Sequence, residues 1–296
     1  MMNRNHQRIL VMAMRKSLFY VLFIALLADC AACSKATEQT SSSPTPAPSP
    51  AASSSPAPAE PTPAPDVVRR KWTGDFDAMK ERRLIRALVV PGTFFFIDKG
   101  QEKGVSYDLL KEFEKEINAT TSKGPLKVHV AIVPVGRDQL VPALLAGKAD
   151  IAAANLTSTE GGRERVDFSN PLLSDVNELV VTGPNSPALS SLDDLSGKEV
   201  TVRASSKYAE HLEKLNESFK KSGKAPVKIV PADKLLEDED ILEMVNAGLI
   251  PITVVDSHVS NLWVQVLDKL KVHSEIVVDS GNEISWAFRK DSPQLK

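Results

Sequence analysis

Cysteine is nearly absent from this chain. Of its 296 residues only Cys30 and Cys33 are cysteines, and both precede the part with the pattern of a folded protein. A disulfide framework is therefore excluded from that part. A strong excess of one charge is lacking too, because 36 Lys and Arg residues face 38 Asp and Glu residues, for a formal net charge of −2. This balance argues against a nucleic acid as a partner.

Familiar catalytic motifs are also missing. The sequence has no Gly-x-Ser-x-Gly turn, no phosphate-binding P-loop and no cysteine nucleophile in its body. Its histidines are scattered without the spacing of metal ligands, and the acidic run at residues 237–240 has the pattern of a helix N-terminus. We therefore expect no catalytic residue, no metal and no cofactor.

The one long apolar run lies near the N-terminus. Arg15 and Lys16 precede an uncharged stretch at residues 17–28, and two alanines then lead to Cys33. About 20 apolar residues are needed to cross a bilayer, so this shorter run predicts a secretory signal peptide over residues 1–33. A cysteine after Ala-Ala is similar to a bacterial lipobox. Cys33 is thus expected to carry lipid and to anchor the protein in the periplasm. Ser34 after the cysteine indicates, by analogy, the outer membrane. The alternative is ordinary cleavage, which gives a soluble product.

Residues 34–70 are rich in proline, serine and alanine. Such a composition cannot bury enough apolar surface to fold, so we expect a disordered tether. From about residue 84, short apolar runs alternate with amphipathic helical patterns in two blocks, which predicts two α/β lobes with a hinge and a cleft between them. The expected divisions are residues 71–182 for the first lobe, 183–278 for the second and 279–296 for a return to the first, apparently truncated.

Residues 148–169 (KADIAAANLTSTEGGRERVDFS) carry the strongest signal of a binding site. A short apolar strand runs into small hydrogen-bonding residues, and then into a Gly-Gly-Arg turn. The carboxyl ends of strands in an open α/β sheet are where small ligands bind. This stretch therefore predicts a ligand loop.

The folded part resembles the bacterial extracellular solute-binding proteins of family 3. The resemblance rests on residues 104–109 (GVSYDL), 138–169, 202–208 (VRASSKY) and 239–263 (EDILEMVNAGLIPITVVDSHVSNLW). The last segment is most similar to the branch found at the N-terminus of membrane-bound lytic transglycosylase F. The resemblance implies a two-lobed, periplasmic-binding-protein-like fold of type II.

The resemblance also implies ligand contacts in the first lobe. Phe94 is at the position of an aromatic residue that stacks on the ligand, and Asn155 and Thr157 are at polar positions that hydrogen-bond it. The family's carboxylate-binding arginine is missing, because Gly162 takes its place and Arg163 comes one residue later. A bidentate Arg–carboxylate pair needs a fixed geometry. Either the turn is re-formed so that Arg163 reaches the ligand, or the protein does not hold a free α-amino acid in this way; we favour the second.

Three residues of the second lobe are further candidates. Arg203 and Ser206 lie at a strand end and at the start of a helix, where an anion can bind. Asp256 is at the family position that receives a ligand amine. Each has a plainer interpretation: a solvated strand end for Arg203, and a helix N-cap for Ser206 and for Asp256. Tyr208 and Trp263 each belong to the apolar pattern of a predicted helix, and both are expected in the core.

These patterns favour a binding protein over an enzyme. The expected function is that of a lipid-anchored periplasmic protein that holds a small amino-acid-like or peptidoglycan-derived ligand, with a transporter or a cell-wall enzyme as possible partner. The alternative is the non-catalytic regulatory part of a lytic transglycosylase, whose muramidase-like domain would follow. The resemblance implies a Glu-Ser motif and a Gly-x-Met-Gln motif in that domain. This sequence has no Gly-x-Met-Gln motif and no Glu-Ser motif within a muramidase-like segment.

Overall fold

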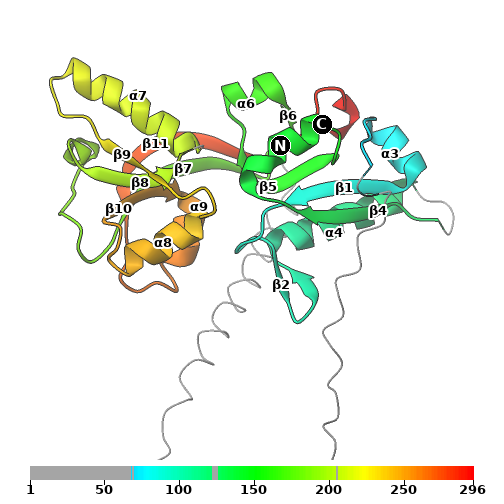
Figure 1. Cartoon of the computed structure of the whole chain (residues 1–296), viewed down its shortest axis with the longest axis horizontal. Coiled ribbons are helices and arrows are strands. Elements are labelled where there is room, and N and C mark those ends of the chain that lie inside the picture. Colours follow the sequence, from blue (N-terminus) through cyan, green and yellow to red (C-terminus); the bar gives the residue numbers. More distant parts are fainter. Residues whose placement is uncertain (1–67, 69, 122–125, 205) are drawn as a thin grey trace, which may run out of the picture.

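A computed structural model describes residue 68 and residues 70–121, 126–204 and 206–296 (Figure 1). The chain forms two α/β lobes, side by side, that share one curled sheet (Figure 1). The expected signal peptide, Cys33 and nearly all of the expected tether lie outside the described residues. No helix in the described part combines the length and the apolarity needed to cross a membrane.

The first lobe contains most of the N-terminal elements. Its strands are β1 (Leu84–Val89), the β2–β3 hairpin (Phe96–Asp98 and Gln101–Lys103), β4 (His129–Pro134), β5 (Ile151–Thr157) and β6 (Asp167–Phe168). Its helices are α3 (Phe76–Arg82), α4 (Val105–Thr121), the short 3-10 helix η1 (Arg137–Gln139), α5 (Leu140–Leu145) and α6 (Glu160–Arg165).

The second lobe repeats the alternation of strands and helices. It contains η2 (Leu192–Leu195), β8 (Glu199–Arg203), α7 (Lys207–Lys221), β9 (Lys228–Ala232), α8 (Asp238–Asn246), β10 (Ile252–Asp256) and α9 (Ser257–Trp263). Two long strands, β7 (Leu173–Thr182) and β11 (Lys271–Phe288), run through both lobes, and a last 3-10 turn, η3 (Pro293–Leu295), follows β11.

The strand order explains how the lobes are joined. The main path is β4-β1-β5-β11-β7-β10-β8-β9. The N-terminal part of β11 pairs with β7, with Lys271 opposite Thr182, and its C-terminal part pairs with β5, with Phe288 opposite Ile151. Register shifts interrupt the β7–β11 ladder between these ends. Irregular pairing twists and bends strands, so this stretch is the natural hinge.

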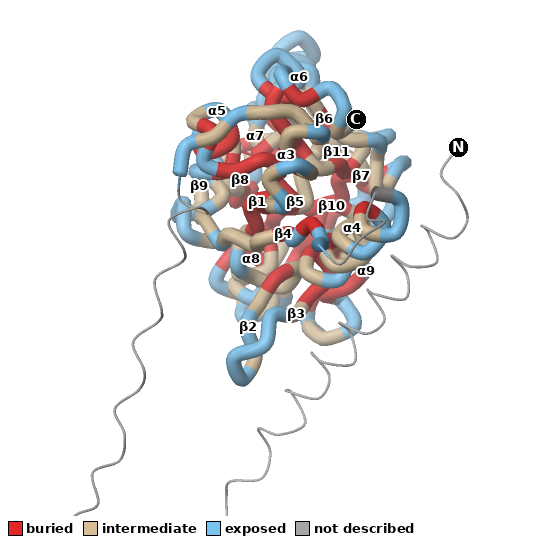
Figure 2. The backbone as a smooth tube through the Cα atoms, turned by 90° about the vertical axis from the view of Figure 1, so that its right-hand side faces the viewer, coloured by how far each residue is buried: buried red, intermediate tan, exposed pale blue. Residues whose placement is uncertain are grey.

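Each lobe has its own apolar core on both faces of its half of the sheet. In the second lobe, Tyr208, Leu212 and Phe219 of α7 are buried against β8 and β10. Their spacing gives the helix one apolar face. In the first lobe, α4 buries Leu110 and Ile117 in a cluster with β1 and β4. Buried residues follow the sheet, whereas the β2–β3 hairpin and α6 are largely exposed (Figure 2).

The structure departs from the expected elements in three places. The sequence pattern predicts separate short strands near residues 271–272 and at residues 284–288, but both are parts of one continuous strand, β11, which crosses from one lobe to the other. Asn155 and Thr157 belong to β5 itself rather than to a loop after it. Residues 160–165 form the helix α6 despite two glycines, since Thr159 caps it by accepting a hydrogen bond from the Gly162 N–H.

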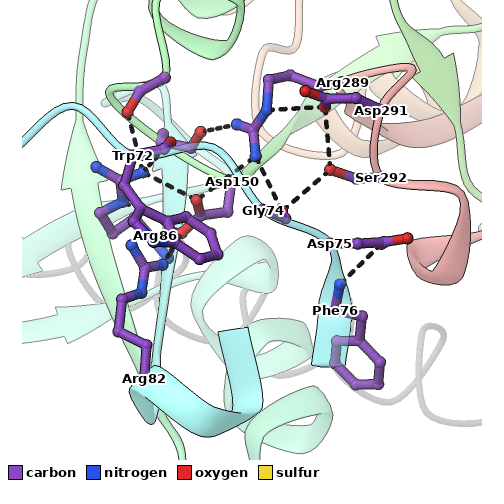
Figure 3. A network of polar contacts seen from close by, with 12 residues as sticks. Trp72, Gly74, Asp75, Phe76, Arg82, Arg86, Asp150, Arg289, Asp291 and Ser292 are labelled. Atoms are coloured by element: carbon purple, nitrogen blue, oxygen red, sulfur yellow. Dashed lines mark hydrogen bonds and ion pairs between the residues drawn. The ribbon is translucent and has the colours of Figure 1, made fainter. Parts of the chain in front are cut away.

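A buried carboxylate holds the base of the first lobe together (Figure 3). Asp150 is fully buried at the start of β5, and its oxygens lie 2.9 Å from Nη2 of Arg86 and 2.7 Å from Nη2 of Arg82. Arg289, at the end of β11, lies 3.9 Å away. Arg86 also donates to the carbonyl oxygens of Arg70, Trp72 and Gly147. One charged group thus connects β1, β5, the segment before α3 and the end of β11.

Replacing Asp150 with alanine should cost about 3–5 kcal/mol of the free energy of unfolding, because it leaves buried guanidinium groups without their carboxylate. Urea denaturation followed by circular dichroism measures the loss. The matched control is Asp193→Ala, since Asp193 is 64% exposed and pairs with Lys224 at the surface; a surface pair contributes about 0–1 kcal/mol. Equal losses in the two variants would contradict this role of Asp150.

Candidate functional site

A cavity of about 490 Å³ lies between the two lobes. This volume is within the usual range of about 300–1,000 Å³ for small-molecule sites. Both lobes contribute to its wall, with strand ends and helix starts facing each other across the hinge. The polar residues that line it include Arg137, Asp138, Asn155, Thr157, Thr159 and Arg165 from the first lobe, and Arg203, Ser206, Lys207, Tyr208, Glu210, Asp238 and Asp256 from the second.

The first lobe presents the end of β5 and the start of α6 to the cavity. Asn155 adopts a left-handed conformation with φ of 52°, which a short polar side chain tolerates. Thr157, Thr159 and Gly162 line the wall beside it. Gly162 has no side chain to offer a ligand, so this part of the wall consists of hydroxyl groups and backbone.

Arg163 lies away from this wall. Its guanidinium donates to the Ser158 hydroxyl at 2.9 Å and lies 3.6 Å from the Glu283 carboxylate, and its side chain is 49% exposed. Arg165, two residues further along α6, lines the cavity instead. It forms no ion pair with any described residue. The glycines therefore do not bring Arg163 to the cavity, and a cation reaches it from a different position on the helix.

Arg203 is held by a carboxylate of the same lobe. Its guanidinium donates from Nε and Nη2 to Asp238, at 2.8 and 3.1 Å. Burial lowers the pKa of Arg203, but the nearby Asp238 carboxylate outweighs this and leaves the pKa above its ordinary value. Burial alone would raise the pKa of Asp238, and the Arg203 charge lowers it below its usual range. Both groups are therefore charged and neutralise each other.

Ser206 and Asp256 start two helices, but only Ser206 caps its helix. The Ser206 hydroxyl accepts from the Ala209 N–H at 3.4 Å and donates to the Arg203 carbonyl oxygen at 2.6 Å. The Asp256 side chain makes no capping bond to α9. Its oxygen Oδ1 lies instead 2.8 Å from Nζ of Lys207, at the cavity wall. The N-cap interpretation thus describes Ser206 and does not describe Asp256.

Lys207 is a buried cation between two carboxylates. Its side chain is 8% exposed, and its Nζ lies 2.8 Å from Asp256 and 3.5 Å from Glu178 of β7. Tyr208, the next residue, is buried as expected, but its hydroxyl reaches the cavity wall, donating to Asp238 at 3.3 Å and accepting from the Asp256 N–H at 3.2 Å. Acidic, basic and phenolic groups of this lobe thus form one connected network.

Glu178, His211 and Asp279 form the one group in the described part of the chain whose ligand atoms lie close enough for a metal ion. Nδ1 of His211 lies 2.9 Å from Glu178 and 3.5 Å from Asp279. The hydrogen bond to Glu178 raises the pKa of His211, and burial only partly opposes this. These contacts are those of an imidazolium between two carboxylates, at the point where β7 and β11 pair across the hinge.

Several polar contacts join the lobes across the cleft. Arg137 of the first lobe lies 2.6 Å from the Glu237 carboxylate of the second. The Thr93 N–H donates to Glu239 at 2.7 Å, and burial raises the pKa of this Glu239 carboxyl. The lobes approach so closely here that a Cβ at Gly92 would overlap the Glu239 carboxylate. The two lobes are thus held in a closed arrangement by the chain's own side chains.

Asn155 and Phe94 take part in this closure as well. Oδ1 of Asn155 lies 3.0 Å from Nε2 of His258, a histidine whose pKa is lowered by burial. The Phe94 ring lies 6.2 Å from the His258 ring, centroid to centroid. Phe94 lines two small cavities of about 40 and 10 Å³ beside the main one, together with Asn155. Phe94 therefore lies next to the main cavity without forming its wall.

Five of the seven predicted ligand residues line the same cavity: Asn155, Thr157, Arg203, Ser206 and Asp256. Phe94 and Arg163 do not. Sequence reasoning missed Arg137, Arg165, Lys207 and Asp238, each of which resembles an ordinary solvated charge in its local pattern. The acidic run at 237–240 does begin helix α8, but its first two side chains also pair with arginines of the cleft.

Replacing Arg137 with alanine should open the lobes, because Glu237 then loses its partner across the cleft. Truncating one member of a largely buried charge pair costs about 2–5 kcal/mol, so the closed fraction should fall at least tenfold relative to the open one. Small-angle X-ray scattering would show a larger radius of gyration. Arg163→Ala is the control, since Arg163 contacts only its own surroundings in the first lobe and β11. Unchanged scattering from Arg137→Ala would rule out this contact as a latch.

Known proteins share the sequence and the fold. The membrane-bound lytic murein transglycosylase F of Methylobacillus flagellatus is 24% identical over 200 residues, which are 68% of this chain and 39% of that protein. The protein of the same name from Saccharophagus degradans is 32% identical over 153 residues, 49% of this chain and 26% of that one. The chain thus spans well under half the length of these curated relatives.

Solved structures agree with the two-lobed architecture. An ancestral arginine-binding protein bound to arginine superposes with a TM-score of 0.58 at 27% identity, covering 72% of this chain and 88% of that one. The arginine-binding protein of T. maritima in its holo form gives a TM-score of 0.56 at 25% identity, covering 74% and 88%. Residues 88–296 match the family model of bacterial extracellular solute-binding proteins, family 3, and the chain belongs to that family.

Proposed function

We propose that this chain is a periplasmic, lipid-anchored solute-binding protein without catalytic activity of its own. It holds a small amino-acid-like or peptidoglycan-derived ligand between its lobes. The cavity carries the proposal: it has the size of a small-molecule site, polar groups of both lobes line it, and two hinge strands connect its walls. Such an architecture closes around a ligand.

The chemistry of the wall favours a ligand with several polar groups. Hydroxyl groups of Thr157 and Thr159 line the cavity and can donate hydrogen bonds, and Arg165 offers a guanidinium that forms no ion pair with any described residue. The position of Gly162, which has no side chain, argues against a buried arginine clamp for the carboxylate of a free amino acid. A larger molecule, such as a short peptide from the cell wall, can place its carboxylate further out, where Arg165 lies.

A second candidate function follows from the relatives. The curated relatives described above are membrane-bound lytic murein transglycosylases F, and the matched region is only part of each. The same lobes would then form a non-catalytic regulatory part that acts on a cell-wall enzyme. Both functions need the same ligand site, and they differ in the partner that responds: a transporter in the first, a transglycosylase domain in the second.

Calorimetric titration and thermal unfolding with amino acids and peptidoglycan peptides test the binding claim. A ligand at 100 times its dissociation constant should stabilise the protein by about 2.7 kcal/mol. Thr157→Trp should abolish this effect by filling the cavity, whereas Thr120→Trp, on the exposed part of α4, should not. A protein that is stabilised by none of these compounds contradicts the proposal, as does release of soluble fragments from purified peptidoglycan.

The lipid anchor has a separate test. Cells that express the chain and are fed an alkyne-bearing fatty acid should incorporate the label into the protein, and Cys33→Ser should abolish labelling. Cys30→Ser is the matched control and should leave the label in place, because Asp29 rather than alanine precedes Cys30. Labelling that survives Cys33→Ser would refute the anchor and leave the binding proposal untouched.

A further inference from the structure

One side chain of the second lobe reaches into the first lobe beside the main cavity. His258 lies in the first turn of α9, directly after β10. Its Nε2 lies 3.0 Å from Oδ1 of Asn155, a residue of β5 in the first lobe. The His258 ring also lies 6.2 Å from the Phe94 ring, centroid to centroid, with the two planes tilted by 52°. His258 therefore contacts two residues of the opposite lobe.

The place that the His258 ring occupies is an apolar recess of the first lobe. Phe94, Leu109 and Leu173 pack there against the buried Val105. A cavity of about 40 Å³ remains in the recess beside the His258 ring, and it is lined also by Ser106, Asn155, Leu172, Ile284 and Trp286. One water molecule takes up about 30 Å³ in the liquid. The remaining space is therefore too small for a ring or a branched side chain of a ligand.

The hydrogen bond to Asn155 defines the form of the His258 ring. Because an amide oxygen only accepts, Nε2 carries the hydrogen. The other ring nitrogen, Nδ1, is buried and has no hydrogen-bond partner among the described residues, and burial lowers the pKa of His258. The ring is therefore neutral. A buried polar atom without a partner is unfavourable, so the recess holds His258 by one hydrogen bond and by apolar contact rather than by a full set of polar partners.

Asn155 also connects the recess to the main cavity. It lines the cavity of about 490 Å³ and the cavity of about 40 Å³. Since His258 belongs to the second lobe and Asn155 and Phe94 belong to the first, separation of the lobes would withdraw the His258 ring. The recess would then be open toward the cleft, and closure would fill it again with the ring of His258.

We propose that His258 is a built-in occupant of this recess, which it fills when the lobes close, so that a ligand group enters the recess only by displacing it. The contact stabilises the closed form and is autoinhibitory for the recess. This inference goes beyond the proposed binding function, because the position of His258 does not depend on which ligand the main cavity holds.

Free imidazole tests this inference without a natural ligand. His258→Ala should lower the ratio of closed to open protein about tenfold, since it removes a hydrogen bond and apolar contact across the cleft, and small-angle X-ray scattering should show a larger radius of gyration. Millimolar imidazole at about pH 8, where its ring is mostly neutral, should take the place of the missing side chain. It should reduce the radius of gyration and raise the melting temperature of this variant.

His129→Ala is the matched control, because it removes an exposed histidine of β4. It should leave the radius of gyration unchanged and should not respond to imidazole. A His258→Ala variant that remains as closed as the unmodified protein overturns the inference. An imidazole response no larger than that of His129→Ala overturns it as well.

Two further measurements separate occupancy of the recess from a general loss of stability. His258→Gln keeps a side-chain N–H donor, so it should remain closed and should respond to imidazole far less than His258→Ala; an equal response contradicts the inference. In the unmodified protein, NMR should show slow solvent exchange of the His258 Nε2–H and a nuclear Overhauser effect to the Phe94 ring. Fast exchange without this effect overturns the inference even where a variant does not fold.

Discussion

The buried charge of Asp150 is the constraint around which the first lobe is arranged. An isolated carboxylate in a protein interior is strongly unfavourable, so it needs cations and hydrogen-bond donors nearby. Arg82, Arg86 and Arg289 supply the charge, and the Arg86 N–H donates at 2.8 Å. These groups come from the first strand, the helix before it and the end of β11. The groups that neutralise the Asp150 carboxylate therefore hold β1 and the helix before it next to the end of β11.

The second lobe uses charges differently, because its charged groups face the cleft. Arg203, Asp238, Lys207, Asp256 and Glu178 lie along one continuous network that also includes the hydroxyl of Tyr208. The buried acids Asp238 and Asp256 each lie beside a cation of the same lobe, so they do not need a cation from a ligand. The first lobe adds hydroxyl groups and the exposed Arg165. Under the proposed function, recognition of a ligand would depend on shape and hydrogen bonding as much as on net charge.

The regular elements of the fold could be predicted from the sequence, since apolar periodicity and capping residues are local signals. The sequence pattern predicts a strand at residues 199–203 and a helix at residues 238–246, and β8 and α8 have these bounds. The continuous strand β11 could not, because its middle lies between the lobes and has no regular burial pattern. The lining of the candidate cavity was predictable where β5 and β10 end, at Asn155, Thr157 and Asp256. The lining was not predictable where a charged residue pairs with one that is distant in sequence, such as Arg137 with Glu237. For the same reason, the local sequence pattern around Lys207 indicates a solvated helix residue.

The contacts of Arg137, Glu239 and His258 across the cleft have a consequence for communication with a partner. A receptor that recognises only the outline of the closed form would respond to this protein whether or not the cavity is filled. A partner would then have to distinguish the filled from the empty cavity by the stiffness or the lifetime of the closed form rather than by its shape. A ligand that bridges the walls prolongs the closed state. A partner that binds slowly would therefore bind the ligand-filled protein more often than the empty one.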